Sequence, residues 1–244
     1  MCLILFAHRV LPGVLLQLDA NRDEFFARPT EVANIWRDHD SIIAGRDQRA
    51  GGTWLGINQQ DGRWAAITNF RDPASRRDDA PSRGALVQDF LLSMSTPRTY
   101  LERIAPNAAR FNGFSLLAGW RDEVCFYSNR GSGVQTVTPG VHGLSNHLLD
   151  EPWPKVTRGT HEMKHLLLRP FADEEHFNLL SDESEAPDEV LPRTGIPIER
   201  ERRYSAIRIR DATYGTRCST VLRIETSGKV QFHERSFAPT GEVT

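Results

Sequence analysis

The sequence predicts an α+β fold in which two antiparallel β-sheets pack together and helices cover their outer faces. Two observations lead to this prediction. The predicted elements follow the order strands, helices, strands, helices, strands, and the strand segments are short, apolar and separated by turn residues. The length of 244 residues is within reach of one hydrophobic core, which stops growing at roughly 250–300 residues. We therefore expect residues 1–244 to form a single domain.

The N-terminal region is predicted to be mostly strand. Residues 2–8 are dense in apolar side chains, a Pro-Gly turn follows, and residues 14–23 resume the apolar pattern. Segments 52–57 and 63–70 form a second strand pair around an Asp-Gly turn. We therefore expect a hairpin that begins at residue 2 and brings the end of its second strand back beside that residue.

Helices and further strands fill the remainder of the chain. Ser82 and Thr96 are expected to cap two consecutive amphipathic helices, the second with Pro97 in its first turn. Further helices are predicted at 154–168 and 174–180, and an acidic loop at 182–195. The remaining predicted strands are 114–120, 123–129, 133–138, 140–146, 204–211, 218–225 and 229–237.

Composition and charge narrow the class of protein. A formal net charge of −2 argues against a nucleic-acid partner. The three cysteines, Cys2, Cys125 and Cys218, are too scattered for a disulfide framework and indicate a reducing compartment. The first apolar run ends at His8 and is far shorter than the roughly 20 residues that cross a bilayer. We therefore expect a cytoplasmic protein without a membrane span, and the sequence leaves its oligomeric state open.

Cys2 is the first candidate for chemistry. Initiator methionine is commonly removed when the next side chain is small, and Cys2 would then carry a free α-amine. Because an α-amine has a pKa of about 7.7–8.0 and a thiol one of about 8.5, the amine can act as general base for the sulfur of the same residue. If Met1 stays, an amide replaces that base. The position alone also fits a buried strand cysteine that acts as a small hydrophobe.

Residues 21–24, Asn-Arg-Asp-Glu, bring one cation and two carboxylates to the end of the second strand. Strand alternation sends Asn21 and Asp23 to one face and Arg22 and Glu24 to the other. Asp23 is then free to approach the α-amine of Cys2, while Arg22 and Glu24 pair elsewhere. Taken alone, the stretch also fits a solvated turn.

Several short motifs in a fixed order resemble the NRDE family, which in eukaryotes is also called the transport and Golgi organisation 2 family. The resemblance runs from Met1 to about residue 225. Its motifs are NRDE at 21–24, RP at 28–29, AGRD at 44–47, GGTWLG at 51–56, TNFR at 68–71, SRG at 82–84, NGF at 112–114, GLSNHLLDEPWPK at 143–155 and YGTRCSTVL at 214–222.

That family is similar to the amino-terminal-nucleophile hydrolases of the bile-acid hydrolase and penicillin V acylase branch. The resemblance implies a four-layer αββα fold and a cysteine amidohydrolase that needs no cofactor and acts on a small acylated amide. It assigns the nucleophile to Cys2, the carboxylate that holds the α-amine to Asp23, and a late-strand arginine that lowers the thiol pKa to Arg217. Asn69 and Asn146 match the asparagines that stabilise the oxyanion. The branch usually has an arginine three residues before the aspartate, where this chain has Ala20.

A binding protein is the alternative to an enzyme. The five tryptophans, with Phe25 and Phe26, fit either core packing or an apolar ligand pocket. Asn21, Arg22, Glu24 and Trp54 are the residues that we expect to bind the small-molecule amide or apolar ligand. The eukaryotic relatives have been linked to haem trafficking and acyl-CoA handling, so a carrier of haem or of an acyl-CoA-type lipid stays open, with His8 or Cys2 as axial haem ligand.

Residues 161–165, HEMKH, formally match the helical zinc motif H-E-x-x-H. His161 and His165 would be the ligands and Glu162 the base. A catalytic zinc ion needs a third protein ligand, which no downstream motif supplies. The segment also follows PWPK within the family resemblance as an outer helix. We therefore expect no metal site there.

Overall fold

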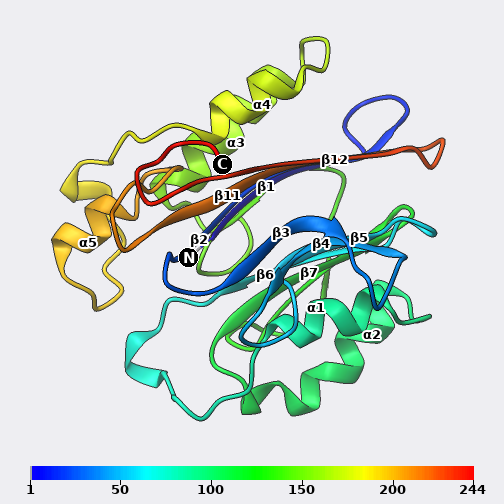
Figure 1. Cartoon of the computed structure of the whole chain (residues 1–244), viewed down its shortest axis with the longest axis horizontal. Helices are drawn as coiled ribbons and strands as arrows, with labels where there is room; N and C mark the ends of the chain where they lie inside the picture. The colour runs from blue at the N-terminus through cyan, green and yellow to red at the C-terminus, as the bar shows by residue number, and fades with distance from the viewer. Residues whose placement is uncertain (1) are drawn as a thin grey trace.

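Four layers make up the computed structural model, which describes residues 2–244: helices, a five-stranded sheet, a seven-stranded sheet and further helices (Figure 1). The five-stranded sheet has the order β10-β1-β2-β11-β12, and the seven-stranded sheet runs in sequence order from β3 to β9. The paired strands in both sheets are antiparallel. The predicted α+β sandwich with outer helices is therefore confirmed.

The five-stranded sheet contains the first and the last strand of the described chain. Its strands are β1 (Cys2–His8), β2 (Val14–Phe25), β10 (Gly140–Leu144), β11 (Tyr214–Glu225) and β12 (Val230–Ser236). The seven-stranded sheet comprises β3 (Thr30–Ile35), β4 (Ile42–Asp47), β5 (Leu55–Asn58), β6 (Trp64–Asn69), β7 (Phe114–Trp120), β8 (Glu123–Ser128) and β9 (Gln135–Thr136). The helices are α1 (Gly84–Leu91), α2 (Pro97–Ile104), α3 (Pro154–Leu166), α4 (Asp173–Leu180) and α5 (Ile198–Arg203), with 3-10 turns at Pro73–Ser75, Ala105–Arg110 and Asp188–Val190.

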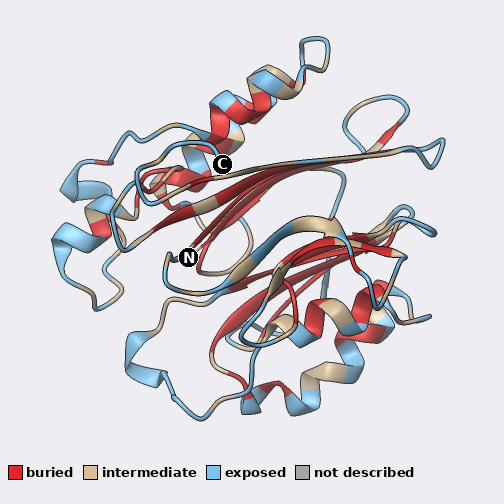
Figure 2. Cartoon of the chain, in the orientation of Figure 1, coloured by how far each residue is buried: buried red, intermediate tan, exposed pale blue. Residues whose placement is uncertain are grey.

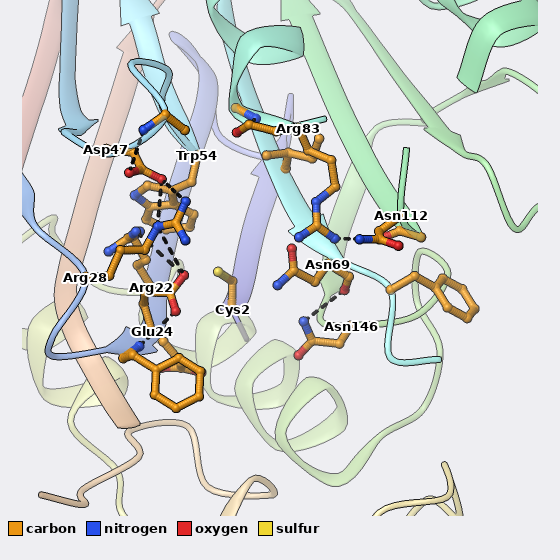
Figure 3. Close-up of a pocket in the computed structure, with 18 of the residues that line it drawn as sticks. Cys2, Arg22, Glu24, Arg28, Asp47, Trp54, Asn69, Arg83, Asn112 and Asn146 are labelled. Carbon is orange, nitrogen blue, oxygen red and sulfur yellow. Dashed lines mark hydrogen bonds and ion pairs between the residues drawn. The ribbon is translucent and has the colours of Figure 1, made fainter. Parts of the chain in front are cut away.

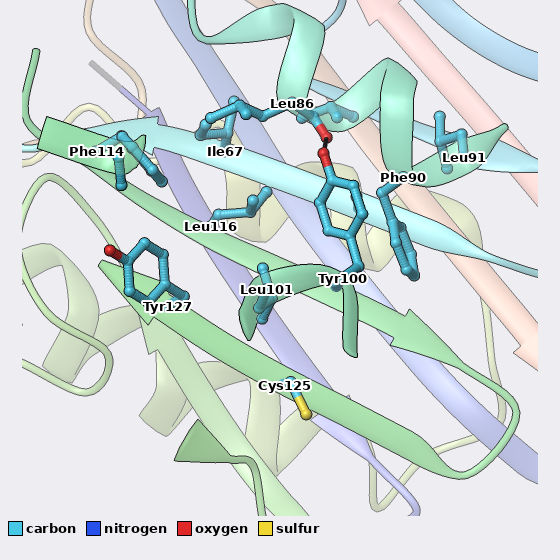
Figure 4. Packing of buried hydrophobic residues seen from close by; sticks show 14 of the residues in the cluster. Ile67, Leu86, Phe90, Leu91, Tyr100, Leu101, Phe114, Leu116, Cys125 and Tyr127 are labelled. Atoms are coloured by element: carbon cyan, nitrogen blue, oxygen red, sulfur yellow. Dashed lines mark hydrogen bonds between the residues drawn. The ribbon is translucent and has the colours of Figure 1, made fainter. Parts of the chain in front are cut away.

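Three buried apolar clusters hold the layers together (Figure 2). Strand β1 contributes to two of them, because its side chains alternate between the faces of the sheet. Leu3 and Leu5 pack on the side of α3 and α4, whereas Ile4 and Phe6 pack against the seven-stranded sheet. In the third cluster, α1 and α2 cover that second sheet, and the Tyr100 hydroxyl donates to the Leu86 carbonyl at 2.6 Å (Figure 4).

Several local predictions are confirmed. The hairpin of β1 and β2 begins at residue 2, and Cys2 lies opposite Arg22. Thr96 caps α2 through a hydrogen bond from the Thr99 N–H, with Pro97 at the first position. The prediction that Ser82 caps α1 is wrong, because the helix begins one residue later, with Arg83 at the cap position and no side-chain cap hydrogen bond. Ser82 accepts from the Gly84 N–H at 3.4 Å. Within residues 2–244, no helix has the length and apolar character that a membrane crossing requires.

The prediction of a strand at 204–211 is wrong. This segment follows α5 as irregular chain, and β11 starts at Tyr214. Its isoleucines alternate with arginines because the isoleucine side chains are buried in the core. The backbone N–H groups of the segment donate to separate partners, so no strand ladder forms. The Ile209 N–H donates to the Thr216 hydroxyl, and the Arg208 N–H donates to the Asp182 carbonyl. Strands β3 and β4 and helix α5 were not predicted.

A close contact between two glycines fixes α1 against the seven-stranded sheet. A Cβ atom on Gly52 would lie 2.5 Å from the carbonyl carbon of Gly84 and 2.7 Å from its oxygen. The Thr53 N–H donates to the same Gly84 carbonyl at 3.4 Å. This approach of two backbones explains Gly52 of the GGTWLG motif and Gly84 of the SRG motif. It also helps to position Trp54, two residues after Gly52, and Arg83, which directly precedes Gly84.

Gly52→Ala is expected to destabilise the fold by about 2 kcal/mol, because its Cβ meets backbone that no rotamer change can move. Gly131→Ala is the matched control, since the nearest atom to its Cβ is the flexible end of Leu148 at 3.2 Å. That variant should change the free energy of unfolding by about 0.5 kcal/mol or less. Urea denaturation measures both, and an equal effect in the two variants would contradict the packing argument.

Candidate functional site

A cavity of about 1080 Å³ opens where β1 begins and where β2 and β6 end. Four of the predicted catalytic residues line it: Cys2, Asp23, Asn69 and Asn146. Three of the predicted binding residues, Arg22, Glu24 and Trp54, line it as well. Arg217 and Asn21 are absent from this wall. In Figure 3, Cys2 lies between a group that contains Arg22 and Glu24 and a group that contains Asn69 and Asn146.

Cys2 presents its sulfur to the cavity from the start of the central strand β1. The residue is 8% exposed, and the directly opposite residue on β2 is Arg22. Burial raises the pKa of the Cys2 thiol, and the charge of Asp23 adds to this effect, whereas Arg22 and a hydrogen bond from the Asp23 backbone lower it. The sulfur is therefore a protonated thiol near neutral pH. Met1, on whose removal the predicted α-amine depends, lies outside the described residues.

The two faces of β2 have different environments. Arg22 and Glu24 point to the cavity, and their charged groups lie 3.9 Å apart. Asp23 belongs to the other face, where its Oδ1 accepts a hydrogen bond from the Thr216 hydroxyl at 2.7 Å. Lys155 Nζ lies 3.8 Å from Asp23 Oδ2, and both side chains are almost fully buried. Burial raises the pKa of Asp23, and Lys155 opposes this.

Asn21 is a structural residue and not part of the cavity wall. Its amide donates to the carbonyls of Leu180 and Ile207 at 2.8 and 2.9 Å. Its Oδ1 accepts from the Ser219 hydroxyl at 2.6 Å. These contacts use both donors of the amide and join β2 to the last residue of α4 and to the segment after α5. The expectation that Asn21 binds a ligand therefore has no support in its position, because it faces the helices.

Arg217 is also turned away from Cys2. The pairing of β11 with β2 shifts by one residue between Thr216 and Cys218, so Arg217 is the extra residue of a β-bulge. Its guanidinium donates to the carbonyls of Phe25 and Arg28 at 3.0 Å each. It therefore holds the turn after β2. Arg22, which lies opposite both Cys2 and Cys218, is the arginine beside the sulfur.

Asn69 and Asn146 connect the two sheets at the cavity. Asn146 Nδ2 donates to the Asn69 carbonyl at 2.9 Å, which leaves its second N–H without a partner among residues 2–244. The side-chain amide of Asn69 is exposed and has no hydrogen-bond partner in the described part of the chain. Ser145 donates to the Cys2 carbonyl at 3.1 Å. Two amide donors therefore border the cavity that contains the sulfur, as an oxyanion site requires.

Ion pairs neutralise most of the buried charge around the cavity. Arg28 contacts Asp47 at 2.6 Å and lies 3.9 Å from Glu24. Arg71 contacts Glu201 at 2.5 Å and lies over the ring of Trp153 at 4.5 Å. Of the other tryptophans, Trp36 and Trp64 belong to the apolar clusters. Trp54 and Phe25 are the aromatic residues from the sequence prediction that line the cavity.

The histidines lie outside the cavity wall. His8 is at the far end of β1 from Cys2, roughly 20 Å along the strand at about 3.3 Å per residue, and it is buried. His161 and His165 face each other on α3, with their Nε2 atoms 3.1 Å apart. Across the described residues 2–244, no group of three or more His, Cys, Asp or Glu side chains is arranged to hold a metal ion.

Two further residues that the sequence analysis did not assign to the site are Lys155, beside Asp23, and Arg83, on the cavity wall. Lys155 lies in the first turn of α3, where burial lowers its pKa. The sequence does contain an indication of its role, because Lys155 ends the GLSNHLLDEPWPK motif in the first turn of a predicted helix. A lysine is unfavourable there next to the positive end of the helix dipole, which suggests that it has another function. Arg83 stands in the SRG motif and lines the cavity.

Comparison with known proteins supports the fold and identifies the family. The model of the family Transport and Golgi organisation 2 matches residues 1–239. Transport and Golgi organization 2 homolog of Mus musculus is 36% identical over 258 residues, covering 97% of this chain and 93% of that protein. The Homo sapiens homolog is 34% identical with the same coverage, and the Drosophila melanogaster protein is 28% identical over 99% of this chain and 95% of its own length.

A solved structure shares the architecture at low sequence identity. It is a Caenorhabditis elegans N-acylethanolamine-hydrolyzing acid amidase ortholog, with a TM-score of 0.52 and 12% identity. The match covers 92% of this chain and 93% of that chain. This likeness confirms the predicted amino-terminal-nucleophile hydrolase type of fold. With the family match over nearly its whole length, the chain belongs to the Transport and Golgi organisation 2 family.

Proposed function

We propose that this protein is an amidohydrolase that uses Cys2 as an amino-terminal nucleophile and cleaves the C–N bond of a small acylated amide. The observation that carries the proposal is the meeting of Cys2, Asp23, Asn69 and Asn146 at one cavity. A thiol, a buried carboxylate and two amide donors are the groups that such a reaction needs. The likeness of the fold to an amidase adds to this support.

The mechanism begins with the removal of Met1. The α-amine of Cys2 takes the thiol proton as Sγ attacks the amide carbonyl carbon, and Asn69 and Asn146 donate to the oxyanion. The intermediate collapses when the C–N bond breaks, and the amine passes the proton to the leaving nitrogen. Water then attacks the thioester, which releases a carboxylic acid and restores the thiol. Asp23 holds the α-amine, and Lys155 favours its ionised form.

A carrier of an acyl-CoA-type lipid is the second candidate function. The volume of about 1080 Å³ favours it, because pockets for small ligands commonly hold about 300–1000 Å³. Haem does not fit as well, since His8 is remote from the cavity and burial keeps the Cys2 thiol protonated. Calorimetry of a Cys2→Ala variant with dodecanoyl-CoA, beside a haemin titration, tests this candidate. Saturable one-to-one binding supports a carrier, and its absence contradicts one.

Protein with Met1 removed, as verified by intact mass, should form an acyl adduct on Cys2 with an N-acyl-aminocoumarin probe and release the fluorophore. Cys2→Ser should reduce the rate by at least about 10³-fold, because the hydroxyl is a far weaker nucleophile near neutral pH. Cys218→Ser is the matched control, since Cys218 is a second buried thiol on the same cavity wall. Peptide mapping locates the adduct. An unmodified Cys2 in active, correctly processed protein would contradict the proposal.

Arg22→Gln should raise the thiol pKa of Cys2 further, because Arg22 is the side-chain cation that lowers it. Below the pKa, alkylation by iodoacetamide follows the thiolate fraction, so its rate at pH 7.5 should fall roughly tenfold and the pH profile should move to higher pH. Arg217→Gln is the control, because its guanidinium is bound to backbone carbonyls after β2. A larger shift in the Arg217 variant would reverse the assignment of the two arginines.

Lys155→Met should destabilise the protein by about 3 kcal/mol near neutral pH, because Asp23 stays buried without its nearby cation. Burial already raises the pKa of Asp23. The loss of Lys155 raises the pKa of Asp23 further. The destabilisation by Lys155→Met should therefore be small near pH 3.9, the approximate pKa of an aspartate in the unfolded chain, and should grow as the pH rises. Adding Asp23→Asn should remove this pH dependence. Urea denaturation from pH 4.5 to 8 measures it, and a cost independent of pH would contradict the coupling.

A further inference from the structure

Arg83 brings a guanidinium into the cavity from the side of the seven-stranded sheet. It precedes α1, whose first residue Gly84 packs against Gly52. Its Nη1 donates to the Gly113 carbonyl at 2.9 Å. Figure 3 shows the guanidinium pointing toward Asn69, on the opposite side of Cys2 from Arg22 and Glu24. One terminal nitrogen of the guanidinium, Nη1, is thus held by the Gly113 carbonyl, and the rest of the guanidinium borders the cavity.

Arg83 differs from the other partly or fully buried arginines of the cavity in its lack of a counterion. Arg22 pairs with Glu24, Arg28 with Asp47 and Arg71 with Glu201. Within residues 2–244, no carboxylate lies within ion-pair distance of Arg83. A guanidinium stays protonated in a protein, and its partial burial takes water from it. An anion that enters the cavity would stabilise this partly desolvated positive charge.

We propose that Arg83 binds a carboxylate on the substrate, so that the site selects N-acyl amides that carry a negative charge over neutral ones. This inference rests on the proposed function, since it places an amide in the same cavity. The planar guanidinium matches the two oxygens of a carboxylate. Among the partly or fully buried arginines of the wall, Arg83 alone lacks an ion pair within residues 2–244, so a single negative charge is balanced at this depth. A phosphate dianion would need a second cation from exposed arginines of the wall such as Arg49, Arg77 and Arg200, whose charge water screens.

An anchor at Arg83 would also orient the substrate. Arg83 and Asn69 line the same side of the cavity, and Cys2 lies between this side and the Arg22 side (Figure 3). A carboxylate held at Arg83 restricts how the amide carbonyl lies between the sulfur and the Asn69 amide. Binding energy from a part of the substrate remote from the reacting bond is then used for positioning.

The test compares two probes with the same acyl chain, N-dodecanoylglycine and N-dodecanoylethanolamine, on protein with Met1 removed. We expect kcat/KM for the glycine conjugate to exceed that for the ethanolamine conjugate by about tenfold or more. Arg83→Gln should reduce this ratio to about one, mainly through KM for the glycine conjugate. Arg83→Lys should keep part of the preference, since the charge stays and the fork is lost.

Arg76→Gln is the matched control. Arg76 also lines the cavity, but its side chain is 74% exposed and lies 3.7 Å from Asp78. This variant should leave the ratio unchanged. Thermal unfolding of all variants checks that the fold is kept. A preference for N-dodecanoyl-O-phosphoethanolamine over the glycine conjugate would overturn the assignment of a carboxylate.

Calorimetry of the same probes with a Cys2→Ala variant separates this inference from the proposed function. Charge-selective binding that is lost in Cys2→Ala/Arg83→Gln supports the Arg83 site, even if the protein with Cys2 hydrolyses neither probe. Equal hydrolysis of both neutral and charged probes, unchanged by Arg83→Gln, overturns the inference and leaves the amidohydrolase proposal standing. Binding of neither probe overturns the inference as well.

Discussion

The hydrogen bonds between segments 68–71 and 145–146 are the constraint on which the cavity depends. They join the end of β6 in one sheet to the residues after β10 in the other. The Thr68 hydroxyl donates to the Ser145 carbonyl at 2.6 Å, and the Arg71 N–H donates to the Asn146 carbonyl at 2.7 Å. The apolar core between the sheets has no directional preference. These polar contacts therefore fix the separation of the strand ends around Cys2.

Strand β2 makes the chemistry of the site possible because its two faces differ. One face contributes Arg22 and Glu24 to the cavity wall, and the other contributes Asn21 and the Asp23 carboxylate to a buried polar layer under α3 and α4. At the end of the strand, Asp23 also borders the cavity. In this layer the Asn21 amide is hydrogen-bonded to two backbone carbonyls and to the Ser219 hydroxyl. Asp23 accepts from Thr216 and lies 3.8 Å from Lys155. Four consecutive polar residues in a buried strand are costly unless each has such partners.

Much of the fold was predictable because hairpins and amphipathic helices leave local signals. The hairpin that sets Cys2 opposite Arg22 follows from two apolar segments and a turn. Strand alternation within residues 21–24 correctly predicts that Arg22 and Glu24 share one face of β2 and that Asn21 and Asp23 share the other. It does not predict which of the two faces points to the cavity. Nothing local marks Arg217 as a bulge residue, since a bulge depends on the partner strand. Arg83 becomes a site residue only through the contact of Gly52 with Gly84, which is distant in sequence.

The bulge at Arg217 has a consequence for how β11 tolerates changes in length. In a regular strand, Thr216 and Cys218 would share a face, yet here Thr216 pairs with Asp23 and Cys218 with Arg22. One inserted residue thus lets a single strand supply a hydroxyl to the buried carboxylate and a thiol to the cavity. If one residue were inserted or deleted in this segment, every following side chain of β11 would point to the opposite face of the sheet. Residues that now face the cavity would then face the buried polar layer, and the reverse. Segment length is therefore under tighter constraint here than the identity of most side chains.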